Sequence, residues 1–240
     1  MIKDDVFTMK TYAIVGNQYQ GLYTKPWSQV QAYTRTKPAP KFKGFATKAE
    51  AQAWFDTQIA VQNDQSRQYT TAYNGQFKAD PNQYYIFTDG GSRNTGNVAG
   101  GHVKASDKAG WAIAIYHGSN LTDPVYTDSG AYFGRTNNEM EILALINALL
   151  QAAKVSTPVT IVSDSKYVLD SVTNWMYNWA NNNWRKSSGE IANLAAWQQI
   201  YALIPPLAER LSFIWVKGHA TSHGNITVDQ LLNDAMDNLS

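Results

Sequence analysis

Two aspartates each follow a short apolar run of the kind that forms a buried β-strand. Asp89 comes directly after one such run and Asp164 after another. The carboxyl ends of strands in α/β sheets form the crevice where ligands bind. Glu141 lies between them in the sequence, on a predicted helix whose surrounding face is apolar. A carboxylate in apolar surroundings is costly unless something positive holds it, so these acids are candidates for chemistry.

A fourth acid, Asp229, lies near the start of the last predicted helix, and the 240 residues contain no cysteine. Oxygen donors without thiolates favour a hard divalent cation, most simply Mg²⁺, with Mn²⁺ as a possible substitute. Two such ions about 3.5–4 Å apart would clamp the attacking and leaving oxygens of a phosphoryl displacement. The structural alternative makes Asp89 a turn residue and makes Asp164 and Asp229 helix N-caps.

His219 follows a predicted strand and precedes a polar segment. A loop histidine with a pKa near neutrality can move a proton or assist product release at a metal site. The alternative is a hydrogen-bonded loop residue. His223, four residues later, is a weaker candidate for the same role.

The elements that must position these residues begin at Tyr84, where strands start to alternate with long helices. Strands are predicted at 84–88, 109–116, 125–133, 159–163 and 211–217, and helices at 137–153, 166–180, 190–204 and 227–238. Short connections favour an antiparallel start, and helical crossovers favour later strands added in parallel. The pattern predicts an α/β fold, a mixed five-stranded sheet with flanking helices.

The residues before Tyr84 predict a small α+β domain and a linker. Strands at 11–15 and 21–23 and helices at 27–33 and 46–55 form the small domain, whose last helix opens with a Thr47–Glu50 capping box. Residues 57–83 are polar without a sustained apolar period, as expected of a linker. The predicted domains are therefore 9–56, the linker 57–83, and 84–240.

Charge is divided unevenly between these regions. Residues 1–56 contain eight basic and four acidic residues, a net charge of +4, whereas residues 84–240 contain ten and thirteen, a net charge of −3. Between Lys25 and Lys48 six basic residues and no acid alternate with aromatic residues. This combination suits a nucleic-acid surface, and equally a solvated basic face over a small aromatic core.

Composition excludes several classes of protein. Apolar residues make up 44% of the chain, which excludes wholesale disorder. The apolar runs are too short for a membrane span, and the N-terminus lacks the features of a signal peptide. We therefore expect a cytoplasmic protein without disulfides, with no membrane association and no evident protein partner.

Four ordered segments resemble the signature segments of type I ribonuclease H. They are Phe87-Thr88-Asp89-Gly90-Gly91-Ser92, Thr136-Asn137-Asn138-Glu139-Met140-Glu141, Ser163-Asp164-Ser165-Lys166-Tyr167-Val168 and Trp215-Val216-Lys217-Gly218-His219-Ala220. The resemblance implies the ribonuclease H-like fold and hydrolysis of the RNA strand of RNA–DNA hybrids, leaving 5′-phosphate and 3′-hydroxyl ends. It also implies two Mg²⁺ ions on the four acids, a mobile catalytic His219, and R-loops and replication primers as substrates.

The N-terminal unit resembles the hybrid-binding (viroplasmin-like) domain that precedes many ribonucleases H. The likeness rests on Tyr12-Ala13-Ile14-Val15, Gly21-Leu22-Tyr23, Trp27, Lys41-Phe42-Lys43 and Phe45 to Ala51. It implies that Trp27 and Phe42 lie against sugars of the DNA strand and that Lys43 meets a phosphate. Gly44 departs from the family, in which a second lysine is frequent.

The resemblance implies further substrate-binding residues in the catalytic region. Amide side chains suit 2′-hydroxyls and base edges, which Asn137 and Asn138 would bind, unless they cap the following helix. Thr136, Arg135 and Asn94 resemble a pocket for a DNA phosphate. Tyr167, Trp175 and Trp179 match positions along the DNA channel, although the helical spacing of the tryptophans equally suits a core stripe.

Residues 180–186 contain fewer lysines than the family often has, and the catalytic region is net acidic. We hypothesise that hybrid affinity depends on the N-terminal module more than usual.

Two other functions compete with the ribonuclease. One is a non-catalytic hybrid-binding protein with the same scaffold. The four acids argue against it, since a site that holds no metal has no physical reason to keep like charges converging. In a transposase or integrase the third carboxylate usually follows the second aspartate, whereas Glu141 precedes Asp164.

Overall fold

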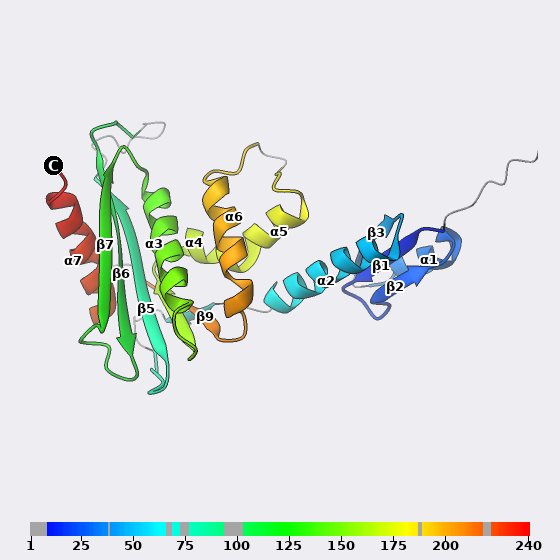
Figure 1. Ribbon diagram of the computed structural model, residues 1–240, viewed down its shortest axis with the longest axis horizontal. Coiled ribbons are helices and arrows are strands. Elements are labelled where there is room, and N and C mark those ends of the chain that lie inside the picture. Colours follow the sequence, from blue (N-terminus) through cyan, green and yellow to red (C-terminus); the bar gives the residue numbers. More distant parts are fainter. Residues whose placement is uncertain are drawn as a thin grey trace, which may run out of the picture. The chain divides into compact units, whose positions relative to one another are not determined.

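The chain is described by a computed structural model that covers residues 9–37, 39–65, 69–72, 77–93, 103–186, 189–217 and 222–240. It forms two compact units, residues 1–66 and 67–240, each with its own sheet. Figure 1 labels the elements of both units in chain order. Among the described residues, no helix is long and apolar enough to cross a membrane.

The first unit is a three-stranded antiparallel sheet with two helices. Its elements are β1 (Thr11–Val15), β2 (Gly21–Thr24), α1 (Trp27–Thr34), β3 (Lys41–Phe45) and α2 (Lys48–Gln65), and the strand order is β2-β1-β3. The central strand is buried at Ala13 and Ile14. The predicted capping box is confirmed, since Thr47 Oγ accepts from the Glu50 N–H and Glu50 Oε2 accepts from the Thr47 N–H.

Two elements of this unit differ from the prediction. Strand β3 was not predicted, because four of its five residues are exposed and their basic charge concealed the alternation of Lys41, Phe42 and Lys43. The helix predicted to end at Phe55 continues to Gln65. Its second half contains mostly polar residues without an apolar stripe, so periodicity could not detect it.

The second unit is built on a six-stranded mixed sheet of order β4-β9-β8-β5-β6-β7. The strands are β4 (Thr70–Ala72), β5 (Tyr84–Ser92), β6 (Lys108–His117), β7 (Tyr126–Phe133), β8 (Val159–Ser163) and β9 (Leu211–Val216). Strands β5, β6 and β7 are antiparallel, whereas β8 pairs in parallel with β5 and β9. The predicted antiparallel start and parallel continuation are confirmed.

The sixth strand, β4, lies in the segment that we expected to be a linker. Its three residues pair in parallel with β9, and Ala72 is buried against the core. Tyr69 donates a hydrogen bond to Asp170, and Phe77 packs 5.3 Å from Tyr85 between ring centroids. A three-residue strand without an apolar run is invisible to periodicity, so the prediction of five strands was wrong by one.

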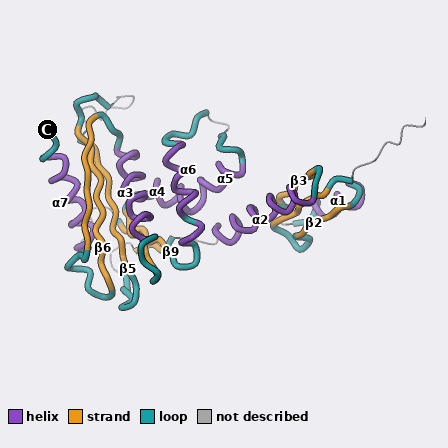
Figure 2. Tube along the Cα trace, viewed as in Figure 1, coloured by secondary structure: helices purple, strands orange, loops and turns teal. Residues whose placement is uncertain are grey.

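Helices cover both faces of this sheet. They are α3 (Asn137–Ala152), α4 (Lys166–Asp170), a π-helical turn (Ser171–Trp175), α5 (Met176–Asn181), α6 (Leu194–Leu203), a short 3₁₀ turn (Pro205–Leu207) and α7 (His223–Asp237). Helix α7 packs on one face of β5 and β6 and α3 on the other, as Figure 1 shows. The purple helices flanking the orange strands in Figure 2 show the same layers.

Three of the helices and one strand differ from those predicted. Helix α6 begins at Leu194, four residues later than expected, and α7 begins at His223, four residues earlier. The helix predicted at 166–180 is interrupted by the π-helical turn. Strand β5 also extends beyond Thr88 to Ser92, because β6 continues to pair with it along its full length.

Candidate active site

The two aspartates lie side by side because one strand ends beside another that continues. Ser163, the last residue of β8, is in register with Thr88 of β5. Asp89 is the next residue of β5, and Asp164 follows the end of β8. The Asp89 carboxylate accepts a 2.7 Å hydrogen bond from the Gly90 N–H. Next to Asp89 the sheet therefore has no β8 residue paired with β5, and Asp164 begins the chain segment that leaves the sheet there.

Glu141 reaches this opening because α3 packs directly against β5. Gly90 is in contact with the backbone of Met140 and Glu141, and a Cβ atom at this position would collide with that backbone. Glycine is therefore required beside Asp89 because of close approach, not because of a special φ angle. The absence of a side chain at Gly90 fixes the distance between the helix and the strand.

Electrostatic repulsion shows that the acids converge. Burial, followed by the charge of Asp164, raises the pKa of Asp89 to about 7, and Asp229 contributes to the same shift. Burial, followed by the charges of Asp164 and Asp89, raises the pKa of Glu141 to about 8. Carboxyl groups that raise one another's pKa in this way are typical of functional sites.

The structural alternatives for the three aspartates are wrong. Asp89 lies within β5 and not in a turn. The N-cap of α4 is Ser165, whose Oγ accepts from the Val168 N–H, so Asp164 does not cap that helix. Asp229 lies inside α7, which starts after Ser222. None of the three carboxylates therefore has the local structural role that would explain it.

The donor chemistry of this site fits a hard divalent cation. One carboxylate oxygen of Glu141, Oε2, is buried without a hydrogen-bond partner. The available donors are carboxylate oxygens, which Mg²⁺ and Mn²⁺ prefer. Within the described ranges, no three His, Asp or Glu side chains are arranged so that they already form a metal site. The carboxylates of Asp89, Glu141 and Asp164 are thus potential metal ligands whose negative charges repel one another.

A tryptophan that sequence reasoning did not single out fixes the main chain at Asp164. Trp215 Nε1 donates a 2.9 Å hydrogen bond to the Asp164 carbonyl oxygen. The Lys166 ammonium lies 4.4 Å from the centroid of the Trp215 ring, which is within the range of a cation–π contact. The position of Trp215 at the end of a strand beside the Asp164 strand was the available signal.

The start of α3 is closed by a capping box. Thr136 Oγ accepts from the Glu139 N–H, and Glu139 Oε2 accepts from the Thr136 N–H. Glu139 also pairs with Arg135 at 3.3 Å. The capping role considered for Asn137 and Asn138 therefore belongs to Thr136. Asn137 instead donates a 2.8 Å hydrogen bond to Glu141 Oε1.

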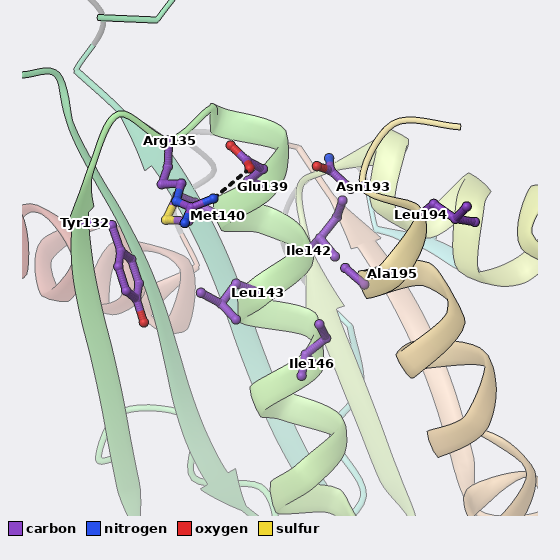
Figure 3. A pocket seen from close by; sticks show the side chains of 11 residues that line it. Tyr132, Arg135, Glu139, Met140, Ile142, Leu143, Ile146, Asn193, Leu194 and Ala195 are labelled. Atoms are coloured by element: carbon purple, nitrogen blue, oxygen red, sulfur yellow. Dashed lines mark hydrogen bonds and ion pairs between the residues drawn. The ribbon is translucent and has the colours of Figure 1, made fainter. Parts of the chain in front are cut away.

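A cavity of about 500 Å³ lies over α3, between Tyr132 of β7 and the start of α6. Figure 3 shows Arg135 and Glu139 at the N-terminal end of α3, with Asn193 facing it from the other side. Asn193 has a left-handed backbone, with φ of 59°. Sequence reasoning missed it, because it had placed Asn193 inside the predicted helix 190–204.

Four aromatic residues of the second unit, Tyr167, Trp175, Trp179 and Trp197, form one connected cluster. Trp179 packs at 5.9 Å from the buried Trp197, and Trp175 and Tyr167 pack at 6.3 Å between centroids. Trp175 is the last residue of the π-helical turn and keeps 39% of its surface exposed. The tryptophans are thus anchored in the core at one side and reach the surface at Trp175.

In the first unit, Trp27 and Phe42 stack with their centroids 5.5 Å apart, and Tyr12 packs on Trp27 at 5.1 Å. Phe42 is 45% exposed, and Lys43 beside it is exposed. The sequence segment that resembles the hybrid-binding domain includes Tyr12 but predicts no role for it. A Cβ at Gly44 would meet the Tyr12 ring at 2.8 Å, which explains the glycine where the family often has lysine.

Two candidate residues, His219 and Asn94, lie outside the described residues. His223 is the first residue of α7 and is exposed.

A mixed sheet of this strand order, with acids gathered where a parallel neighbour ends, defines the ribonuclease H-like class of nucleic-acid hydrolases. Comparison with known proteins specifies the class further. The ribonuclease H family model matches residues 81–237, and the chain belongs to the ribonuclease H family. The model of the ribonuclease H1 N-terminal domain matches residues 10–55.

Individual relatives agree with the family match. The chain is 36% identical over 156 residues to a ribonuclease H of Hydrogenovibrio crunogenus, covering 65% of this chain and 96% of the relative. It is 37% identical over 147 residues to one of Rickettsia canadensis, covering 61% and 84%. The solution structure of the PFV RNase H domain shares the fold, with a TM-score of 0.56, 21% identity and coverage of 66% and 98%.

Proposed function

We propose that this ribonuclease H hydrolyses the RNA strand of RNA–DNA hybrids by two-metal catalysis at Asp89, Glu141, Asp164 and Asp229. The observation that carries the proposal is the buried, unpartnered Oε2 of Glu141, in a carboxylate that the charges of Asp164 and Asp89 repel. Like charges that converge without a cation destabilise a fold, so their convergence supports a cation site.

In the proposed reaction, water attacks a phosphorus atom of the RNA strand and the bond from phosphorus to the 3′ oxygen breaks. The products carry 5′-phosphate and 3′-hydroxyl ends. Bound Mg²⁺, or Mn²⁺ in its place, would polarise the phosphate and lower the pKa of the attacking water. The chain holds the donors in place, Glu141 through α3 and Asp164 through the bond from Trp215.

His219 would transfer a proton to the leaving group or assist product release, since its unperturbed pKa lies near neutrality. Its effect on the rate would be smaller than that of Asp89 or Asp164, because water can replace a proton donor more easily than another donor can replace a metal ligand.

Selectivity for a hybrid requires the recognition of two different strands. Asn137 and Asn138 are exposed at the start of α3 and suit 2′-hydroxyls of the RNA strand. Arg135, Thr136 and Asn94 would bind a phosphate of the DNA strand, with Tyr167, Trp175 and Trp179 along its sugars. A pure duplex lacks one of the two features and would be rejected.

The exposed surface of the first unit would hold the same hybrid. Trp27 and Phe42 form a stacked aromatic platform, and Lys43 supplies a positive charge beside it. Aromatic faces pack on sugars or bases and cations on phosphates, without dependence on sequence. R-loops and replication primers are the proposed sources of the hybrids.

A cleavage assay tests this proposal directly. End-labelled RNA annealed to DNA is incubated with the protein in Mg²⁺, with and without EDTA, beside single-stranded RNA and both pure duplexes. We expect cleavage of the hybrid alone, and its loss with EDTA. A gel shift of the hybrid without cleavage in Mg²⁺ or Mn²⁺ would identify a binding protein instead.

A further inference from the structure

We infer that Asn137 is a positioning residue for the metal-binding carboxylate of Glu141, in addition to any contact with RNA. The structural basis is the 2.8 Å hydrogen bond from Asn137 Nδ2 to Glu141 Oε1. This inference rests on the proposed function, since it treats Glu141 as a metal ligand.

The amide of Asn137 is available for this contact because the helix start is satisfied without it. Thr136 and Glu139 cap α3 reciprocally, and the Asn137 side chain takes no part in this capping box. Asn137 and Glu141 are four residues apart in α3, so their side chains lie on one face of the helix. The geometry of α3 therefore places the Asn137 amide one turn before the Glu141 carboxylate, within reach of it.

The contact distinguishes the two oxygens of Glu141. Oε1 is held by Asn137, whereas Oε2 is buried without a partner, in a carboxylate that the charges of Asp164 and Asp89 repel. Gly90 fixes the main chain of Glu141 by close contact. With its main chain held by β5 and one oxygen held by Asn137, the side chain retains one free oxygen for a cation.

Orientation by an outer hydrogen bond is a general feature of metal sites, in which ligating carboxylates are themselves hydrogen-bonded and loss of the partner typically costs 10–100-fold in affinity or activity. Asn138 provides a matched comparison. It has the same side chain at the next position of α3, is exposed, and makes no side-chain hydrogen bond with any residue that the structure describes.

The experiment measures metal binding by the full chain in the absence of nucleic acid. Free Mn²⁺ is followed by electron paramagnetic resonance during titration of the wild type, Asn137→Ala and Asn138→Ala, with Mg²⁺ competition as a second measurement. We expect Asn137→Ala to weaken binding at least about tenfold. Asn138→Ala should bind the ion within a factor of two of the wild type.

Equal Mn²⁺ affinity of Asn137→Ala and the wild type would overturn the inference, and would leave Asn137 as a substrate contact alone. Thermal unfolding in EDTA shows whether both variants keep the fold. Hybrid cleavage by the wild type is measured in parallel. If the wild type cleaves the hybrid but Asn137→Ala binds Mn²⁺ normally, only the positioning role fails, whereas a wild type without cleavage contradicts the proposed function itself.

Discussion

The carboxylate of Asp164 has no capping role, and the main chain that carries it is held by Trp215. Its position beside Asp89 therefore reflects the site and not the stability of α4. The same holds for Glu141, which lies on a helix already capped by Thr136. At the residue scale Asp164 and Glu141 can therefore be changed without removing the caps of α4 and α3.

Asp164→Asn should reduce kcat for hybrid cleavage by at least about a hundredfold. The reason is that the lost carboxylate charge stabilises chiefly the transition state and contributes little to substrate binding. Hybrid affinity in the absence of turnover should change less than threefold. Single-turnover cleavage and a filter-binding isotherm measure the two effects. Asp123→Asn, an equal charge change in the exposed β6–β7 connection, serves as the control. A near-normal rate for Asp164→Asn would remove this residue from the catalytic set.

The raised pKa values of Asp89 and Glu141 predict how the stability of the metal-free protein depends on pH. The folded protein keeps these protons up to about pH 7 and 8, whereas the ordinary values are 3.8 and 4.5. The native state thus binds more protons than the unfolded state between these limits, and the free energy of unfolding falls as pH rises from about 4 to about 8.

Urea unfolding in EDTA at pH 5.5 and 8.5 measures this effect. Glu141→Gln should lose part of the decline, because its side chain cannot ionise. An identical decline in the wild type and the variant would mean that other groups control the pH dependence. Addition of Mg²⁺ at the higher pH should restore stability to the wild type, since a cation relieves the repulsion.

Several of these residues could be predicted because apolar strands followed by an acid are visible in the sequence. Asp89 and Asp164 are examples of this pattern. For Trp215 the sequence shows only a position near the end of a strand, and the hydrogen bond from its indole N–H to the distant Asp164 carbonyl oxygen could not be predicted from that. Asn193 and Arg135 line the same cavity only after the chain has folded, and no spacing in the sequence relates them.

At the scale of elements, the contact between α3 and β5 sets the geometry of the site. Gly90→Ala places a methyl group against the main chain of Glu141, which cannot move without shifting α3. We expect a loss of about 3 kcal/mol in the free energy of unfolding, at the upper end for overpacking, together with a large loss of activity.

Gly91→Ala is the matched control for that change. A Cβ at Gly91 would meet only the end of the Leu232 side chain, at 3.1 Å. A flexible side chain can turn aside, so the cost should be about 1 kcal/mol or less. Equal destabilisation of the two variants in chemical denaturation would contradict the role assigned to the α3–β5 contact.

Elements with an apolar period could be predicted within a few residues, as β8 and α3 illustrate. Strand β4 and the second half of α2 could not be, because their residues lack that period. Strand β4 is held by main-chain pairing with β9, and such pairing leaves almost no trace in side-chain type.

At the scale of the whole molecule, basic charge gathers in the first unit while the catalytic region is net acidic. Deletion of residues 1–66 should therefore raise KM for the hybrid and reduce the dependence of KM on salt, because fewer counterions are released on binding. The value of kcat should change little.

Kinetics at several salt concentrations test this expectation. Lys43→Ala in the full chain supplies a second measurement, in which the salt dependence should decrease by about one phosphate contact. If both KM and its salt dependence are unchanged in the deletion variant, hybrid affinity belongs to residues 67–240, and the charge division has no role in binding.

Strand β4 also affects how the protein behaves in concentrated solution. It covers the outer side of β9, an apolar strand whose main-chain groups would otherwise be open to pairing with other molecules. A fragment that begins at residue 81, where the family match begins, would lack this cover. Such a fragment would expose a template for intermolecular β-pairing, so aggregation rather than loss of catalysis would be its first defect.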